Sequence, residues 1–208
     1  TPYTPDEDDD GILKWLTDDG YQVWLAHYTS NTEFTDSLEI NSACIGRQIS
    51  DIAQYDVDGK VTLISSSLGG VVSRYYLEGA AEDSEEYPYQ NDVDRFFTLG
   101  SPHKGMPIGL FVDLGLLDCD ANDALCDIGV TDLREFNSSR DRAEDVVYNF
   151  IGGNASMDNI KGGALAIASI LNPLGDNDGL VFTSSALGRE ASFSDYEISG
   201  IYGRFETD

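Results

Sequence analysis

The sequence predicts an α/β fold in which a mostly parallel sheet has helices on both faces. Apolar runs of strand length are one sign, segments with apolar residues at helical spacing are a second, and the two kinds alternate along much of the chain. Such alternation predicts parallel strands, because a parallel pair needs a crossover connection that is usually a helix. At 208 residues the chain is long enough for one sizeable core, so we expect a single domain over residues 1–208.

The first part of the chain supplies two helix–strand units. Residues 11–19 (GILKWLTDD) are predicted to form a helix that ends near Gly20, and residues 21–28 (YQVWLAHY) a strand. Residues 35–55 carry leucine and isoleucine at roughly helical spacing, which predicts a second helix. The apolar, partly β-branched run at 61–65 is then the next strand.

The alternation continues and then lapses. A helix is predicted from Leu68, and the run VDRFFTL at 93–99 is predicted to be a strand that ends in the turn GSPHKG. Residues 105–142 are irregular, and we expect them to form a lid-like insertion. A strand resumes at 146–151 (VVYNFI), and residues 198–205 (ISGIYGRF) are a candidate for a further one.

The net charge of the chain excludes one class of binding partner. Lysine and arginine number 12 against 38 aspartates and glutamates, which gives a formal net charge of -26. Such a surface repels a phosphate backbone, so no nucleic-acid partner is expected. Two interpretations of the acidity stay open, adaptation to a saline habitat or simply the well-solvated surface of a secreted protein. No apolar run approaches the roughly 20 residues of a membrane-spanning helix, so no membrane span is expected.

The three cysteines do not have the spacing of a zinc site, and only His27 and His103 could complete one. A disulfide between Cys119 and Cys126 would close a short polar segment, which is plausible in a secreted protein. Cys44 is expected to be a small buried residue of the second helix.

An acidic segment is a weaker candidate for a calcium site. Its oxygen-bearing side chains alternate as calcium ligands do, but the glycine and the closing glutamate of a calcium loop are missing, so a solvated loop is favoured. The residues are Asp118, Asp120, Asn122 and Asp123.

Residues 61–70 (VTLISSSLGG) indicate a nucleophilic serine. An apolar strand runs into a tight turn of small residues and then a helix, and a serine at the tip of such a turn points its hydroxyl out of the sheet. That serine is Ser67. The residues two before and two after it must be small because the chain reverses tightly, and they are Ser65 and Gly69. The pattern is therefore S-x-S-x-G in place of G-x-S-x-G.

Three segments in the same order resemble the α/β-hydrolase superfamily, and within it the bacterial secreted lipases and esterases. VTLISSSLGG resembles the nucleophile elbow, FFTLGSPHKG the next strand with its T-P-H-x-G-type turn, and DGLVFTSSA the acid-bearing D-G-V-V-P-x-S-S-A segment. Together they span most of the chain. The resemblance implies the α/β-hydrolase fold, secretion, and hydrolysis of a small-molecule or lipid ester through an acyl-enzyme, with no cofactor.

The resemblance also implies residue roles. Ser67 is the nucleophile, Asp178 is the triad acid with Asp176 as a near rival, and the backbone N–H of Leu68 is one donor of the oxyanion hole. Considered without the resemblance, Asp178 in D-N-D-G is more simply a turn residue before Gly179.

The general base is the difficulty, because the superfamily's chain order is Ser, Asp, His and no histidine follows Asp178. His103 corresponds to a family histidine that is not the base, and His27 comes too early in the order, although at the end of a predicted strand it could line the pocket. We therefore expect a piece of a longer hydrolase. It lacks a leading strand with an H-G loop that supplies the second oxyanion donor, and a histidine that follows soon after Asp208.

Two alternatives stay open. The apolar residues at 108–117 either contact a greasy acyl group or belong to the core. The chain as a whole is either an esterase or a non-catalytic binding or structural module that keeps the fold with an idle serine.

Overall fold

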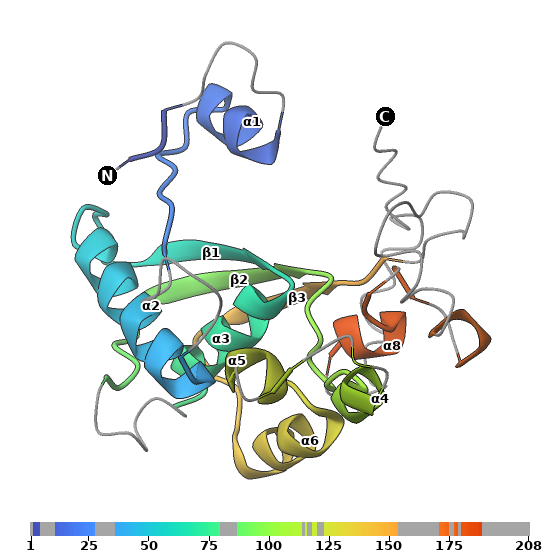
Figure 1. The fold of residues 1–208 in the computed structure, drawn as a ribbon. Helices are drawn as coiled ribbons and strands as arrows, with labels where there is room; N and C mark the ends of the chain where they lie inside the picture. Colours follow the sequence, from blue (N-terminus) through green and yellow to red (C-terminus); the bar gives the residue numbers. More distant parts are fainter. Residues whose placement is uncertain are drawn as a thin grey trace.

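The computed structural model describes residues 2–4, 11–27, 36–79, 87–113, 115, 118–119, 123–153, 171–174, 177–178 and 180–188. Within them, helices and strands alternate as the sequence predicts (Figure 1). In chain order the elements are α1 (Ile12–Asp18), α2 (Leu38–Ala53), β1 (Val61–Ser66), α3 (Leu68–Leu77), β2 (Val93–Leu99), α4 (Ile108–Asp113), α5 (Asp123–Cys126), α6 (Val130–Ser139), β3 (Val147–Ile151), the 3-10 helix η3 (Asn172–Leu174) and α8 (Thr183–Ala186).

The three strands form a parallel sheet in the order β1-β2-β3. All three lie where the sequence places them, and this confirms a parallel α/β arrangement. The register pairs Ser66 with Leu99 and Leu99 with Ile151, so the strands end together at one edge of the sheet. The residues that follow the strands are therefore neighbours in space, although they are far apart in the sequence.

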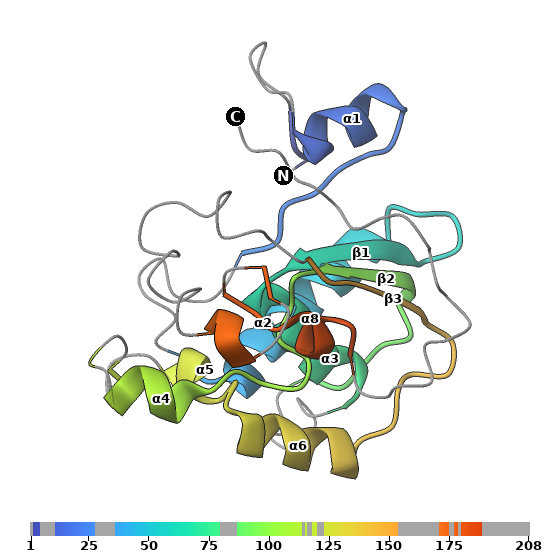
Figure 2. The ribbon, with the colours of Figure 1, turned by 90° about the vertical axis from the view of Figure 1, so that its right-hand side faces the viewer.

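Helices α2 and α3 pack on one face of this sheet, and α6 lies on the same side (Figures 1 and 2). Ser37 is the N-cap of helix α2, because its hydroxyl accepts the N–H of Ile40 and so satisfies one free donor of the first turn. Its apolar side chains recur on the buried face, and α3 is buried along almost its whole length. In the described part of the chain the opposite face is more open, with Ile64 41% exposed.

The prediction of a strand at 21–28 is wrong for the described residues 21–27. Only Trp24 forms a β-bridge, an antiparallel one with Pro2, and its ring stacks on Tyr55. Tyr21 and Leu25 are 65% and 42% exposed. A strand needs a partner with which to pair, and among the described residues β1 pairs with β2 alone, so aromatic and branched residues by themselves do not bring this segment into the sheet.

The segment at 105–142 contains α4, α5 and α6, and parts of it pack in the core. Phe136 of α6 is buried and stacks on Tyr75 of α3 with ring centroids 4.3 Å apart. In α4, Phe111 is buried, whereas Leu110 and Val112 are 36% and 39% exposed. Of the two interpretations for 108–117, the core therefore accounts for one face of α4, and a lid function stays a prediction.

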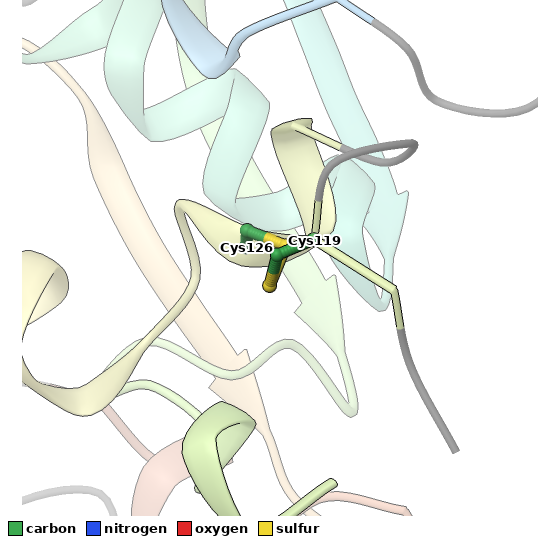
Figure 3. The surroundings of a disulfide bond; sticks show 2 residues. All are labelled: Cys119 and Cys126. Carbon is green, nitrogen blue, oxygen red and sulfur yellow. A yellow bond between two sulfur atoms is a disulfide. The ribbon is translucent and has the colours of Figure 1, made fainter. Parts of the chain in front are cut away.

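A disulfide joins Cys119 and Cys126, with their Cα atoms 5.5 Å apart, and confirms the predicted pairing (Figure 3). Cys44 is half-buried and not fully buried as predicted, and its thiol donates a weak hydrogen bond to the carbonyl of His27. Among the described residues, no helix is long and apolar enough to cross a bilayer. The candidate strand at 198–205 lies outside the described residues.

Candidate active site

Ser67 lies between β1 and α3, at the tip of a strand-to-helix turn. Its side chain is exposed, and its backbone has φ 49° and ψ -130°. Among the described non-glycine residues only Ser67 and Asn91 have a positive φ. Such a conformation costs on the order of 1–3 kcal/mol and persists only where its surroundings hold it. The sharp turn that the sequence predicts is present, and the serine is at its tip.

The small residues around Ser67 have identifiable reasons. A Cβ on Gly70 would overlap the hydroxyl of Ser101 and lie 2.6 Å from Ser101 Cβ, so only glycine lets α3 approach the turn after β2 this closely. Ser65 replaces the glycine of the family pattern, and its hydroxyl lies 2.9 Å from that of Ser73 in α3. Ser73 in turn donates to the carbonyl of Gly69. The extra side chain therefore links strand to helix across the turn.

Asp178 is half-buried, and its own turn holds its carboxylate in place. Oδ1 accepts the N–H groups of Leu180 and Val181 at 3.0 and 2.8 Å, and the N–H of Asp178 donates to the carbonyl of Val181. Oδ2 accepts no hydrogen bond from the described residues, so it is available for a further partner.

Two glycines place Asp178 at the same edge of the sheet as Ser67. A Cβ on Gly100, just after β2, would lie 2.9 Å from Asp178 Oδ2, and one on Gly153, just after β3, would lie 3.0 Å from Asp178 Cβ. Ser67 follows β1, whose carboxyl end lies at the same edge as those of β2 and β3. The carboxyl edge of a parallel sheet is where open α/β folds bind ligands. The structure therefore brings both predicted residues to the expected edge.

Leu68 is the first residue of α3, and its side chain is buried. The N–H of a first helical residue has no acceptor within the helix and lies at the positive end of the helix dipole. That this N–H donates to a negative oxygen beside Ser67 stays a prediction.

His103 lies in the turn after β2 and is fully buried. Its Nε2 is 2.8 Å from Thr98 Oγ1, and its ring stacks on Phe150 of β3 with centroids 4.1 Å apart. Burial, followed by the charges of Arg74 and Arg142, holds the pKa of His103 well below its ordinary value. The residue is thus a neutral side chain packed inside the turn, and that it is not the base stays a prediction.

His27 does not end a strand of the sheet, so the reason to expect it near the pocket is removed. Its backbone N–H and carbonyl both bind the side chain of Gln48 in α2, at 3.0 and 2.7 Å. Asp176, the rival to Asp178, lies outside the described residues, as do Asp120 and Asn122 of the candidate calcium loop. Among the described residues, no group of three or more His, Cys, Asp or Glu side chains could hold a metal ion.

A hollow of about 440 Å³ lies away from Ser67, where α3 ends and before β3 begins. The disulfide and Ser67 do not line it. Its lining residues from 89 and from 139–145 precede β2 and β3, so the hollow lies at the amino ends of the strands, away from the carboxyl edge that holds Ser67. We therefore assign no catalytic role to it. The lining residues are Leu77, Glu78, Gly79, Tyr89, Ser139, Arg140, Asp141, Ala143 and Asp145.

Several residues that shape the site escaped the sequence analysis. Gly100 and Gly153 make room for Asp178, and the signal that could have found them is a glycine just after a predicted strand. Asn137 binds the turn after β2 through the carbonyl of His103, and nothing in its local sequence indicates this contact.

No family model and no curated protein matches this sequence, but solved structures do. The fold is similar to the mature form of the Bacillus licheniformis lipase BlEst2, with a TM-score of 0.63 and 21% identity over 86% of this chain and 71% of that one. The propeptide form of that lipase matches with a TM-score of 0.60 and 23% identity, over 84% of this chain and 38% of that one. The metagenomic carboxyl esterase MGS0156 matches with a TM-score of 0.59 and 16% identity, over 81% and 51%.

At these identities the likeness concerns the fold. The chain has the α/β-hydrolase fold of bacterial lipases and esterases, and this confirms the fold class that the sequence predicts.

Proposed function

We propose that the protein is a serine hydrolase of carboxylic esters that acts through an acyl-enzyme on Ser67. The observation that carries the proposal is the exposed, positive-φ serine at the turn from β1 to α3, on the sheet edge that also holds Asp178. A fold alone does not establish a chemistry. The lipase and esterase neighbours support the proposal, because this chain carries the nucleophile turn and the carboxylate on that fold.

The chemistry follows from these positions. Ser67 Oγ attacks the ester carbonyl carbon while a base takes its proton, and the N–H of Leu68 donates to the negative oxygen that forms. Such a donor lowers the barrier by about 3 kcal/mol. Collapse of the intermediate expels the alcohol and leaves the acyl group on Ser67, and water then releases the acid. Asp178 orients the base and stabilises its cation through Oδ2.

The base is the part of the mechanism that no described residue supplies. His103 is buried and neutral, and the backbone of His27 is bound to α2 outside the sheet. The general base and the second oxyanion donor stay predictions.

Secretion is part of the proposal. Disulfides persist in oxidising compartments, and the Cys119–Cys126 bond supports an extracellular location. The exposed apolar side chains Leu110 and Val112 on α4 are compatible with an acyl or lipid substrate.

A fluorophosphonate reagent tests the proposal in the full-length protein, because it reacts covalently with an activated serine. We expect mass spectrometry to find the adduct on Ser67, and Ser67→Ala to abolish both the adduct and the hydrolysis of a p-nitrophenyl ester. The matched control is Ser66→Ala, an exposed serine one residue earlier, which should keep the adduct. Asp178→Asn should lower kcat by about 10⁴-fold, as in other triads.

A folded full-length protein with no adduct on Ser67 would contradict the proposal. It would favour the second candidate, a non-catalytic module with this fold. The observation behind that candidate is that neither His27 nor His103 is positioned as the base.

A further inference from the structure

A buried polar cluster connects α3 and α6 behind the proposed active site. The side chains of Arg74 in α3 and of Glu78, which caps the end of that helix, are both 0% exposed and are joined by two hydrogen bonds of 2.8 Å. Arg74 also donates to Asn137 Oδ1 of α6 at 2.7 Å. A buried ion pair contributes little net stability, because desolvation offsets the attraction between the charges. The main effect of the cluster is therefore to fix the relative positions of the groups that it binds.

The remaining donors of this cluster converge on one backbone carbonyl. Asn137 Nδ2 donates to the carbonyl of His103 at 2.9 Å, and Arg74 Nη1 donates to the same oxygen at 3.4 Å. Two helices thus hold the turn at 100–105 from one side. On the other side the ring of His103 contacts Thr98 and Phe150.

This turn contacts the surroundings of both proposed catalytic residues. Gly100, its first residue, faces Asp178 Oδ2, and Ser101 packs against Gly70 in the first turn of α3, three residues after Ser67. In each contact the glycine has no side chain, so the partner side chain packs directly against the glycine backbone. A shift of the turn would therefore move Asp178 relative to Ser67.

We infer that Asn137 and Arg74 are positioning residues: by holding the His103 carbonyl they fix the turn at 100–105, and through it the Asp178 carboxylate relative to Ser67. The inference rests on the proposed function. A displacement of about 1 Å within a catalytic group costs on the order of 100-fold in rate, so contacts this far from the chemistry can still set the rate.

Asn137→Asp is the variant that isolates the contact. It keeps the size and the acceptor for Arg74 but removes the donor to the His103 carbonyl and sets a carboxylate beside it. Arg74 itself is unsuitable, because its loss would leave Glu78 buried without a cation. Two controls lie on the same helix. Ser138→Ala changes the exposed next residue. Leu133→Ala removes a fully buried side chain and so lowers stability, while it keeps both donors to the His103 carbonyl.

In the full-length protein, below its thermal transition, Asn137→Asp should slow the labelling of Ser67 by fluorophosphonate and lower kcat by about 10- to 100-fold. KM for a p-nitrophenyl ester should change by less than about twofold, and both controls should keep kcat within about twofold of the parent. Hydrogen exchange at the amides of Leu180 and Val181, which bind Asp178, should become faster in Asn137→Asp relative to the amides of β1. The Leu133→Ala variant should not show this difference.

Unchanged labelling in Asn137→Asp overturns the inference, and so does an equal slowing in a Leu133→Ala variant of equal melting temperature. If the parent protein is not labelled at all, the proposed function fails, and hydrogen exchange then decides the inference by itself. Faster exchange at Leu180 and Val181 in Asn137→Asp supports the positioning role, and unchanged exchange refutes it.

Discussion

Ser67 is held in a conformation that a serine side chain avoids, and its neighbours supply the restraint. Its N–H donates to the carbonyl of Leu99 at 3.0 Å, and its own carbonyl accepts the N–H of Gly70 at 3.1 Å. The cost of the positive φ is on the order of 1–3 kcal/mol, which the packing of the turn must offset. At this scale the sequence predicted the residue and its turn, because small residues around a serine are a local signal.

His103 shows what a local signal misses. Its place in the turn could be predicted from the sequence. Its burial depends on Thr98, on Phe150 and on the two helices that enclose the turn. The sequence placed His103 in a turn after a strand, whereas its full burial is seen only in the structure.

The burial of His103 predicts a pH dependence of stability. Its pKa in the folded protein is held well below 6.5, by burial first and then by nearby positive charges. Below about pH 6.5 the unfolded chain binds a proton that the folded chain does not, so stability is lost as the pH falls through this range. We expect the free energy of unfolding to fall by up to about 1.4 kcal/mol per pH unit from this residue. Urea denaturation at about pH 7.5, 6.5 and 5.5 measures it.

The matched pair of variants for this effect is His103→Gln and His27→Gln. Above the pH range in which carboxylates titrate, His103→Gln should abolish the dependence of the free energy of unfolding on pH. His27→Gln, a change at an exposed residue, should keep that dependence. An identical slope in His103→Gln and the parent would refute the prediction.

At the scale of elements, the strands and the long helices follow their sequence patterns closely, and the exception has a physical reason. The strands at 61–66, 93–99 and 147–151 lie within a residue of their predicted bounds. The segment at 21–27 is also apolar, but within the described residues it pairs only through the single bridge between Trp24 and Pro2. Periodicity reports which residues can be buried, while pairing requires a second strand.

The contact between α3 and the turn at 100–105 predicts a severe effect of one methyl group. Gly70→Ala would place a Cβ against Ser101 and Thr98, so we expect a loss of about 1–3 kcal/mol in the free energy of unfolding. Ser101→Gly in the same chain removes the two closest atoms and should recover most of that loss. Urea denaturation of the single and double variants checks both statements.

Gly109 in α4 provides the control, because a Cβ there meets nothing within 4 Å. Gly109→Ala should be neutral or stabilise the protein by about 0.5–1 kcal/mol, since alanine favours a helix over glycine. If Gly70→Ala costs no more than Gly109→Ala, the close approach is not a constraint on the fold.

For the molecule as a whole, the acidic charge is the dominant electrostatic feature. Twelve lysines and arginines cannot neutralise 38 acids, so a net charge of -26 remains whatever ion pairs form. Folding brings these charges closer together than they are in the unfolded chain, and the repulsion opposes the compact state.

Salt should therefore stabilise the protein. Between about 0.1 and 1 M NaCl the screening length falls from about 10 to 3 Å. We expect a gain on the order of 1 kcal/mol, seen as a rise of about 2–4 °C in melting temperature. A variant with Asp51→Asn and Asp58→Asn, both exposed, should gain less from salt than the parent. A melting temperature that is the same at both salt concentrations would count against repulsion and favour the plain solvated surface.

By itself the sequence determined the parallel α/β architecture and the serine at the strand-to-helix turn, because hydrophobic periodicity and turn chemistry are properties of neighbouring residues. Only the tertiary structure decided which residues meet at the sheet edge. Gly100 and Gly153 admit Asp178, and Asn137 reaches the carbonyl of a residue 34 positions earlier. Those contacts depend on how the strands and helices pack, and no stretch of sequence contains that information locally.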